Sequence, residues 1–112
     1  MTDSQMARLL AEALGFTVMR DCTSSVRIHG KSAGTTYFNP ISNDANAHAV
    51  MRHFHIGCVP IGNEEWRCFP VDDADKQAFW IQRSNLNRAI VECAVRVVQE
   101  SSPSAAGGEG KT

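Results

Sequence analysis

The amino-acid sequence predicts a single α+β domain in which about three helices pack on a small, mostly antiparallel sheet. Long segments near both ends of the chain repeat apolar residues at helical spacing, and short β-branched and aromatic segments lie between them. The chain has 112 residues, of which 43% are hydrophobic and 21% charged, and this composition suits one independent core. We expect the element order α-β-β-β-α-β-β-α within residues 1–100, followed by a flexible tail at residues 101–112.

The first helix is expected to begin near Asp3 or Ser4, because either side chain can cap its N-terminus. Gly15 stands where a helix often ends in the left-handed conformation. The apolar residues that recur at helical spacing between these ends are Met6, Leu9, Leu10, Ala13 and Leu14.

Three short strands should follow, at residues 16–19, 26–29 and 35–38. Val26 and Ile28 alternate with polar residues, which places both side chains on the buried face of a sheet. Turn-forming residues separate the first two strands, and a glycine-rich loop precedes the third. The third strand should stop at Asn39-Pro40, because proline donates no hydrogen bond to a neighbouring strand.

A second helix is expected over about residues 43–55, with Asn43 in an N-cap cluster and Gly57 as its terminator. Its apolar stripe consists of Ala47, Val50, Met51 and Phe54.

Two further strands are expected at residues 58–61 and 66–69, and Pro60 restricts the first of them to a sheet edge or a bend. A charged turn should follow at residues 72–76. Residues 77–83 stay open between a buried strand and an early helical turn, because Phe79, Trp80 and Ile81 are consecutive.

The last helix is expected to start near Ser84 and to form the spine of the core. Its buried stripe consists of Leu86, Ala89, Ile90, Cys93, Ala94, Val97 and Val98. The segment after Glu100 has no large apolar residue to anchor it, so we expect it to be a flexible tail.

Charge, hydropathy and cysteine content narrow the class of protein. The formal net charge of −1, from 11 basic and 12 acidic residues, gives no overall attraction to nucleic acid. The apolar segments are too short to cross a bilayer and no signal-peptide core is present, so we expect a cytoplasmic protein. Most or all of the four cysteines should then be reduced thiols of the core: Cys22, Cys58, Cys68 and Cys93.

Gly30-Lys31-Ser32 is similar to the end of a phosphate-binding loop. That loop needs an earlier glycine where this sequence has Ser25, and it needs a helix directly afterwards. The residues after Ser32 favour a strand. The segment therefore predicts a hairpin loop in which Lys31 is solvated.

The histidines of the second helix are candidates for zinc binding, because His48, His53, His55 and Cys58 are close in sequence and carry the donor atoms that zinc prefers. His48 and His55 share a helical face, but His53 points to the opposite side. No Cys-x-x-Cys or His-x-x-x-His pair occurs. We therefore predict no metal site and no cofactor.

Nucleophilic catalysis would need Cys22 or Cys68 beside one of the histidines, and nothing in the sequence brings them together. A thiol or metal enzyme around Cys58 and Cys68 is a further hypothesis, which metal analysis and alkylation of the thiols would test. The carboxylates cluster in segments typical of solvated loops. We therefore predict that the protein is not an enzyme and has no catalytic residues.

Aromatic residues in the later half of the chain favour binding to another protein, because aromatic side chains anchor protein interfaces. An acidic loop beside them would supply a polar rim. The predicted partner-binding residues are Trp66, Phe69, Asp72, Asp73, Asp75 and Trp80.

An alternative is a site for a small ligand or nucleic acid, formed by the basic hairpin and the histidine-rich second helix. Its predicted residues are Arg27, His29, Lys31, His48 and Arg52. The sequence leaves the oligomeric state open, a homodimer included.

Three segments together resemble the phage ABA sandwich domain family, which consists of small phage and prophage proteins. They are LLAEALG at residues 9–15, FNPISNDANA at residues 38–47 and NRAIVECA at residues 87–94. The second segment is similar to the family's aromatic-Asn-Pro-Leu-x-Asn/Asp-x-x-Asp-Ala pattern. The matching order of elements covers most of the chain up to about Glu100.

The resemblance implies a non-enzymatic accessory protein in the cytoplasm of an infected bacterium, because the family has no established catalytic residues. Small phage accessory proteins commonly act by binding. The resemblance thus implies a host bacterial protein or complex as the partner. The implied function is to inhibit or modulate that partner, for instance a CRISPR complex or another defence protein.

Overall fold

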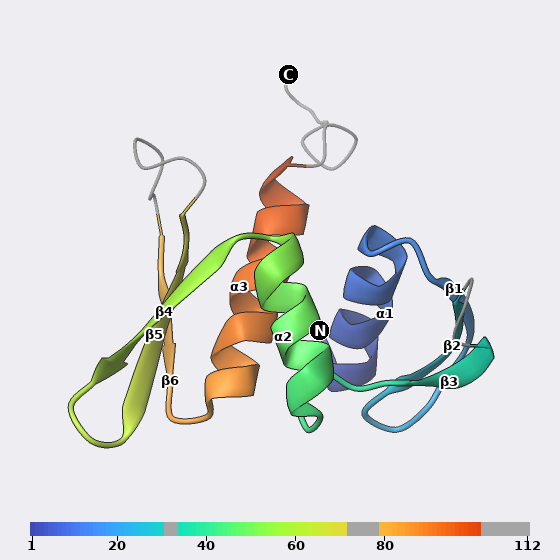
Figure 1. The fold of residues 1–112 in the computed structure, drawn as a ribbon, viewed down its shortest axis with the longest axis horizontal. Coiled ribbons are helices and arrows are strands. Elements are labelled where there is room, and N and C mark those ends of the chain that lie inside the picture. The colour runs from blue at the N-terminus through green and yellow to red at the C-terminus, as the bar shows by residue number, and fades with distance from the viewer. Residues whose placement is uncertain (31–33, 72–78, 102–112) are drawn as a thin grey trace.

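The computed structural model describes residues 1–30, 34–71 and 79–101, and it confirms the predicted α+β class. In these residues three helices lie between two antiparallel sheets of three strands each (Figure 1). The elements are α1 (Asp3–Ala13), β1 (Thr17–Asp21), β2 (Val26–Gly30), β3 (Gly34–Phe38), α2 (Asp44–His53), β4 (Ile56–Ile61), β5 (Glu65–Pro70), β6 (Ile81–Arg83) and α3 (Leu86–Ser101).

The strands form two sheets where the sequence suggests one small sheet. The order is β1-β2-β3 in the first sheet and β4-β5-β6 in the second. The chain passes from β3 through α2 to β4, so the helices separate the two groups of strands (Figure 1). Short connections, at residues 22–25 and 62–64, join β1 to β2 and β4 to β5, because antiparallel strands can be linked by a tight turn.

The N-terminal cap of α1 is Thr2, and the expectation of Asp3 or Ser4 is wrong by one or two positions. Thr2 Oγ1 accepts a hydrogen bond from the Gln5 amide at 3.2 Å, and Gln5 Oε1 accepts one from the Thr2 amide at 2.7 Å. This reciprocal capping box satisfies two amides that the helix leaves without partners. At the other end, Gly15 has a φ of 93°, which confirms the left-handed residue predicted there.

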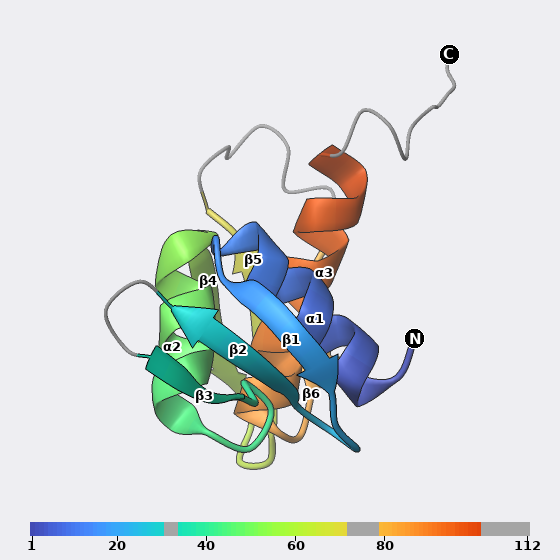
Figure 2. The same ribbon diagram turned by 90° about the vertical axis from the view of Figure 1, so that its right-hand side faces the viewer.

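The first sheet packs on α1 through β1 and β2 (Figure 2). Val26 and Ile28 are buried, as their alternation with polar residues predicts. The third strand ends at Phe38, directly before Asn39-Pro40, which is also as predicted.

Three asparagines turn the chain from β3 into α2. Asn43 is the N-cap, and its Oδ1 accepts from the Asn46 amide at 3.0 Å. Asn46 Oδ1 in turn accepts from the Asn39 amide at 3.0 Å. The helix then ends at His53, earlier than expected, and His55 carries the positive φ of 54°. Gly57 is therefore not the terminator and belongs to β4.

The second sheet has β5 at its centre and β4 at one edge, which confirms the edge position that Pro60 requires. The structure assigns residues 81–83 to a strand, β6, where the sequence left strand and helix open. Phe79, just before β6, is buried. The predicted charged turn at residues 72–76 lies outside the described residues, as do residues 102–112 of the predicted tail, and residue 101 ends α3.

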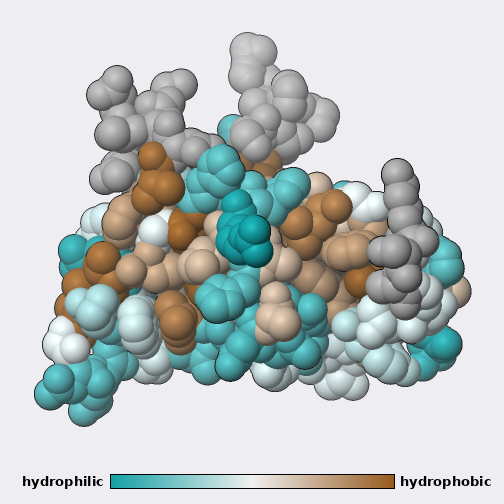
Figure 3. All heavy atoms as spheres, in the orientation of Figure 1, coloured by the Kyte–Doolittle hydropathy of each residue, from teal (hydrophilic) through white to brown (hydrophobic). Residues whose placement is uncertain are grey.

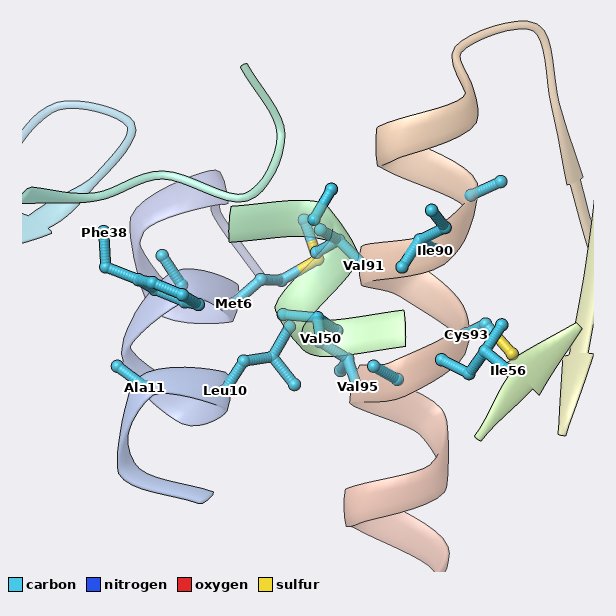
Figure 4. Close-up of a cluster of buried hydrophobic side chains, with 14 of the residues drawn as sticks. Met6, Leu10, Ala11, Phe38, Val50, Ile56, Ile90, Val91, Cys93 and Val95 are labelled. Atoms are coloured by element: carbon cyan, nitrogen blue, oxygen red, sulfur yellow. The ribbon is translucent and has the colours of Figure 1, made fainter. Parts of the chain in front are cut away.

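Helix α3 is the spine of the core, as predicted, but it is buried around more of its circumference than one stripe. It contacts α1 and α2 on one side and all three strands of the second sheet on the other. In Figure 4, Val91 and Val95 point toward α1 and α2, whereas Cys93 points toward Ile56 of the second sheet. Val91 and Val95 were not in the predicted stripe, because a stripe describes a helix with a single buried face.

Ion pairs tie neighbouring elements to α3 at the margin of the core. Arg88 pairs with Asp3 of α1 at 3.1 Å, and Glu92 pairs with Arg83 of β6 at 2.7 Å. These side chains are partly exposed, so each pair contributes little to stability and mainly fixes orientation. Among the described residues, no helix has the length and hydropathy needed to span a membrane.

Because α3 is central, substitutions of its fully buried residues should destabilise the protein more than substitutions of its partly buried ones. Val91→Ala should lower the free energy of unfolding by about 2–3 kcal/mol, because Val91 is 0% exposed and its removal leaves a cavity. Val97→Ala, the matched control, should cost less than about 1 kcal/mol, because Val97 is only partly buried. Urea denaturation of both variants measures the difference, and equal losses would contradict burial of α3 on two sides.

Candidate functional site

The outer face of the second sheet carries apolar side chains. Successive residues of a strand point to opposite faces, and Cys58, Cys68 and Ile81 oppose one another across β4, β5 and β6 on the face that packs against α3. The intervening residues and their flanking neighbours form the opposite face. We call this surface the outer face of the second sheet and define it as Gly57, Val59, Ile61, Glu65, Arg67, Phe69, Val71, Trp80 and Gln82.

It is unusual for the exposed face of an antiparallel sheet to carry so many apolar residues. Such a sheet normally buries one face and carries polar residues on the other. Here Val59 is 39%, Val71 46% and Trp80 53% exposed. Figure 3 shows hydrophobic residues gathered over the second sheet, at the left of the view. Clustered exposed apolar residues are typical of an interaction surface.

A layer of contacts holds the outer face in shape. The guanidinium carbon of Arg67 lies 4.2 Å from the ring centroid of Trp80, and Arg67 Nε and Nη2 both donate to Gln82 Oε1. Gln82 Nε2 donates to Glu65 Oε1. The stacked guanidinium orients the indole, so one side of the Trp80 ring is fixed against the sheet.

Gly57 lets the side chains of β5 lie close to β4. A Cβ atom at this position would be 2.8 Å from Val71 Cγ1 and 3.1 Å from Phe69 Cε2. Those distances are shorter than ordinary van der Waals contact. A larger residue here would therefore displace the side chains of Val71 and Phe69, so Gly57 serves the packing of the outer face and not a helix terminus.

The structure separates the residues that the sequence suggested for partner binding. Phe69 and Trp80 lie on the outer face, whereas Trp66 opposes Arg83 on the other face of the same sheet. The remaining three predicted residues lie outside the described part of the chain: Asp72, Asp73 and Asp75. Val59, Val71 and Arg67 were missed, although the alternation of residues about the Gly62-Asn63 turn could have placed them beside Phe69.

The alternative basic site is divided between two elements. Arg27 and His29 point outward from β2, and Tyr37, which is 56% exposed, is the register partner of Arg27. Lys31 lies outside the described residues. His48 and Arg52 are exposed on α2, which packs with α3 and β4. The first sheet instead packs on α1, so His48 and Arg52 belong to a different surface.

A cleft of about 360 Å³ opens between α2, α3 and β4. Its floor is mainly apolar, and Asn87 Nδ2 donates to Asp44 Oδ1 at 2.8 Å at its rim. The lining residues are Asp44, Ala47, His48, Met51, Cys58, Asn85, Leu86, Asn87 and Ile90. His48 and Cys58 therefore share this cleft, which is large enough for a small ligand.

Cys58 and Cys68 form a hydrogen-bonded pair of thiols beside the cleft. The Cys68 thiol donates to Cys58 Sγ at 3.1 Å, and this hydrogen bond lowers the pKa of Cys58 below that of an ordinary thiol. The same hydrogen bond, together with burial, raises the pKa of Cys68. Burial raises the pKa of Cys93, on α3, to about 12. Of this hydrogen-bonded pair, Cys58 is therefore the accessible thiol and the one whose ionisation is favoured, whereas Cys68 is buried.

The histidines do not converge on a metal site. The ring of His53 packs edge-on against Phe54, with centroids 4.8 Å apart, and His55 occupies the turn into β4. Within residues 1–30, 34–71 and 79–101, no group of three or more His, Cys, Asp or Glu side chains is arranged to hold a metal ion.

Neither the known protein families nor the curated proteins give a match to this sequence. The resemblance to the phage family therefore stays a prediction.

The packing at Gly57 predicts the effect of adding one methyl group. Gly57→Ala should lower the free energy of unfolding by about 1–3 kcal/mol, because the new Cβ would overlap Val71 Cγ1. The cost should be smaller when the same change is made in a Val71→Ala background, because the nearest contact is then gone. Chemical denaturation of the four proteins of this double-mutant cycle measures the coupling, and equal costs in both backgrounds would contradict the packing described.

Proposed function

We propose that this protein acts by binding another protein through the outer face of the second sheet, and that it is not an enzyme. The observation that carries the proposal is the exposed Trp80, held in place by Arg67 among Phe69, Val59 and Val71. Tryptophan and arginine are the residue types most enriched among those that dominate binding energy. A surface already fixed by internal contacts loses little conformational freedom when a partner binds.

The chemistry of this surface defines the kind of partner. Its centre is apolar and aromatic, and Glu65 and Gln82 supply polar groups beside it. A matching partner would offer an apolar patch with hydrogen-bonding groups at its border, the usual anatomy of a protein interface. Trp80 would fill a pocket in that patch.

The resemblance to small phage proteins supplies the biological setting of the proposal. It favours a host bacterial protein or complex as the partner, encountered in the bacterial cytoplasm. The effect of binding would be inhibition or modulation of that partner, and an anti-defence role such as an anti-CRISPR activity belongs to this class. The proposed mechanism is steric, because a bound protein that covers a functional surface of its target needs no chemistry of its own.

Affinity capture from bacterial lysate tests this proposal directly. The tagged protein should retain one dominant host protein, identified by mass spectrometry, and Trp80→Ala should weaken binding to the purified partner by about tenfold or more. Trp80 is 53% exposed, so the variant should keep its fold, which circular dichroism checks. A shorter chain that ends at Glu100 would show whether residues 101–112 take part.

Tyr37→Ala is the matched control for Trp80→Ala. Tyr37 is 56% exposed, but it lies on β3 of the first sheet, which is on the opposite side of the helices from the second sheet (Figure 1). The control should bind the captured partner as strongly as the unmodified protein. Loss of binding in Tyr37→Ala but not in Trp80→Ala would reject the outer face of the second sheet as the binding surface.

The first sheet supports a second candidate function, the binding of single-stranded nucleic acid. Arg20, Arg27 and Tyr37 lie side by side in register on its outward side, and a flat aromatic ring beside cations is the usual platform for stacking a base. Fluorescence anisotropy with a labelled oligonucleotide tests it. Binding that weakens with salt and is lost in Arg27→Ala would support this function, and no binding at low salt would remove it.

A further inference from the structure

Two thiols face each other across the hairpin of β4 and β5. Cys58 and Cys68 are register partners in this antiparallel pair, and their Sγ atoms are 3.1 Å apart. Directly opposed residues of antiparallel strands have Cα atoms about 4.5–5.5 Å apart, which lies within the range of disulfide-bonded cysteines. The sulfurs at 3.1 Å need to approach by only about 1 Å to reach bonding distance.

The two thiols differ in access to solvent. Cys58 is partly exposed and lines the cleft between α2, α3 and β4, whereas Cys68 is 0% exposed. A small reagent in the cleft therefore meets Cys58. The hydrogen bond that Cys68 donates favours the thiolate of Cys58, and the thiolate is the form that attacks a disulfide.

We propose that Cys58 and Cys68 form a redox-active dithiol, which a low-molecular-weight disulfide such as oxidised glutathione converts into a cross-strand disulfide. Cys58 is the attacking thiol and Cys68 is the resolving thiol. The proposal concerns these residues alone and does not depend on the binding function proposed above.

The reaction proceeds in two balanced steps. The Cys58 thiolate attacks one sulfur of oxidised glutathione, which forms a mixed disulfide and releases the first glutathione thiolate. That thiolate takes up the proton that Cys58 has lost. Cys68 then loses its proton and attacks Cys58 Sγ, which forms the Cys58–Cys68 bond and releases the second glutathione. Two electrons pass from the two cysteines to the glutathione disulfide, which becomes two thiols.

The other two cysteines provide internal comparisons. Cys22 lies in the turn between β1 and β2, where its amide donates to Ser25 O at 2.8 Å. Cys93 is 0% exposed on α3. Cys22 is accessible but belongs to the other sheet, so Cys22→Ser is a matched control that should leave the proposed reaction unchanged.

Peptide mapping of the full-length protein tests the proposal. The reduced protein is incubated with oxidised glutathione, its remaining thiols are alkylated, and it is digested with trypsin. Cleavage after Arg52, Arg67 and Lys76 places Cys58 on peptide 53–67 and Cys68 on peptide 68–76. The expected product is these two peptides joined, with two hydrogen atoms fewer than their sum. If both cysteines stay alkylated at every glutathione concentration, the proposal is overturned.

Two variants test the separate roles of the thiols. Cys68→Ala should accumulate glutathione on Cys58, because the resolving thiol is missing. Cys58→Ala should take up no glutathione at Cys68, because Cys68 is buried. Uptake at Cys68 in Cys58→Ala protein that circular dichroism shows to be folded would overturn the assigned order.

The unmodified protein gives the same information if a variant does not fold. In a time course, the glutathione adduct of Cys58 should appear before the joined peptides. A stable adduct of Cys58 that never resolves would overturn the role of Cys68.

Discussion

Helix α3 must bury apolar side chains in two directions, and the rest of the structure depends on this constraint. The helices α1 and α2 cover one side of it, and the second sheet covers the other. Ala89, Cys93 and Ala94 are all 0% exposed, and their small side chains allow neighbouring backbones to come close. The first sheet packs on α1, whereas the second sheet packs on α3 and α2. Among the described residues, each sheet therefore has one face against helices and one face that no helix covers, and these two uncovered faces differ in chemistry.

The sequence was sufficient for the class, the helices and most of the strands, because these depend on local patterns. Periodicity located α1, α2 and α3, and the alternation at Val26 and Ile28 gave the correct buried face of β2. What it missed depends on contacts between distant residues. The division into two sheets follows from the path of the chain through α2, and the burial of Val91 follows from packing on a second side. The left-handed residue at the end of α2 is His55, which no glycine rule would select.

The site could be predicted only in part for the same reason. Aromatic composition identified Phe69 and Trp80, but it could not tell that Trp66 lies on the opposite face, because the face depends on register. The Cys58–Cys68 pair was also within reach, since both residues are equidistant from Asn63 in the hairpin. The sequence suggested Cys58 and Cys68 together without a geometry, and the strand register shows that the two thiols face each other. The register of the hairpin thus determines which aromatic residues share a face and which thiols are neighbours.

The division of the strands also determines where the protein is vulnerable to aggregation. β1 and β3 are the edges of the first sheet, and β4 and β6 are the edges of the second. An unpaired edge offers amide and carbonyl groups to any extended chain. Three of these edges have features that hinder the addition of another strand. β1 has an irregular register, β4 contains Pro60, and β6 has only 3 residues. β3, with the sequence GTTYF, carries neither a proline nor a charge. At high concentration, β3 is therefore the edge where strand addition and fibrous assembly would begin.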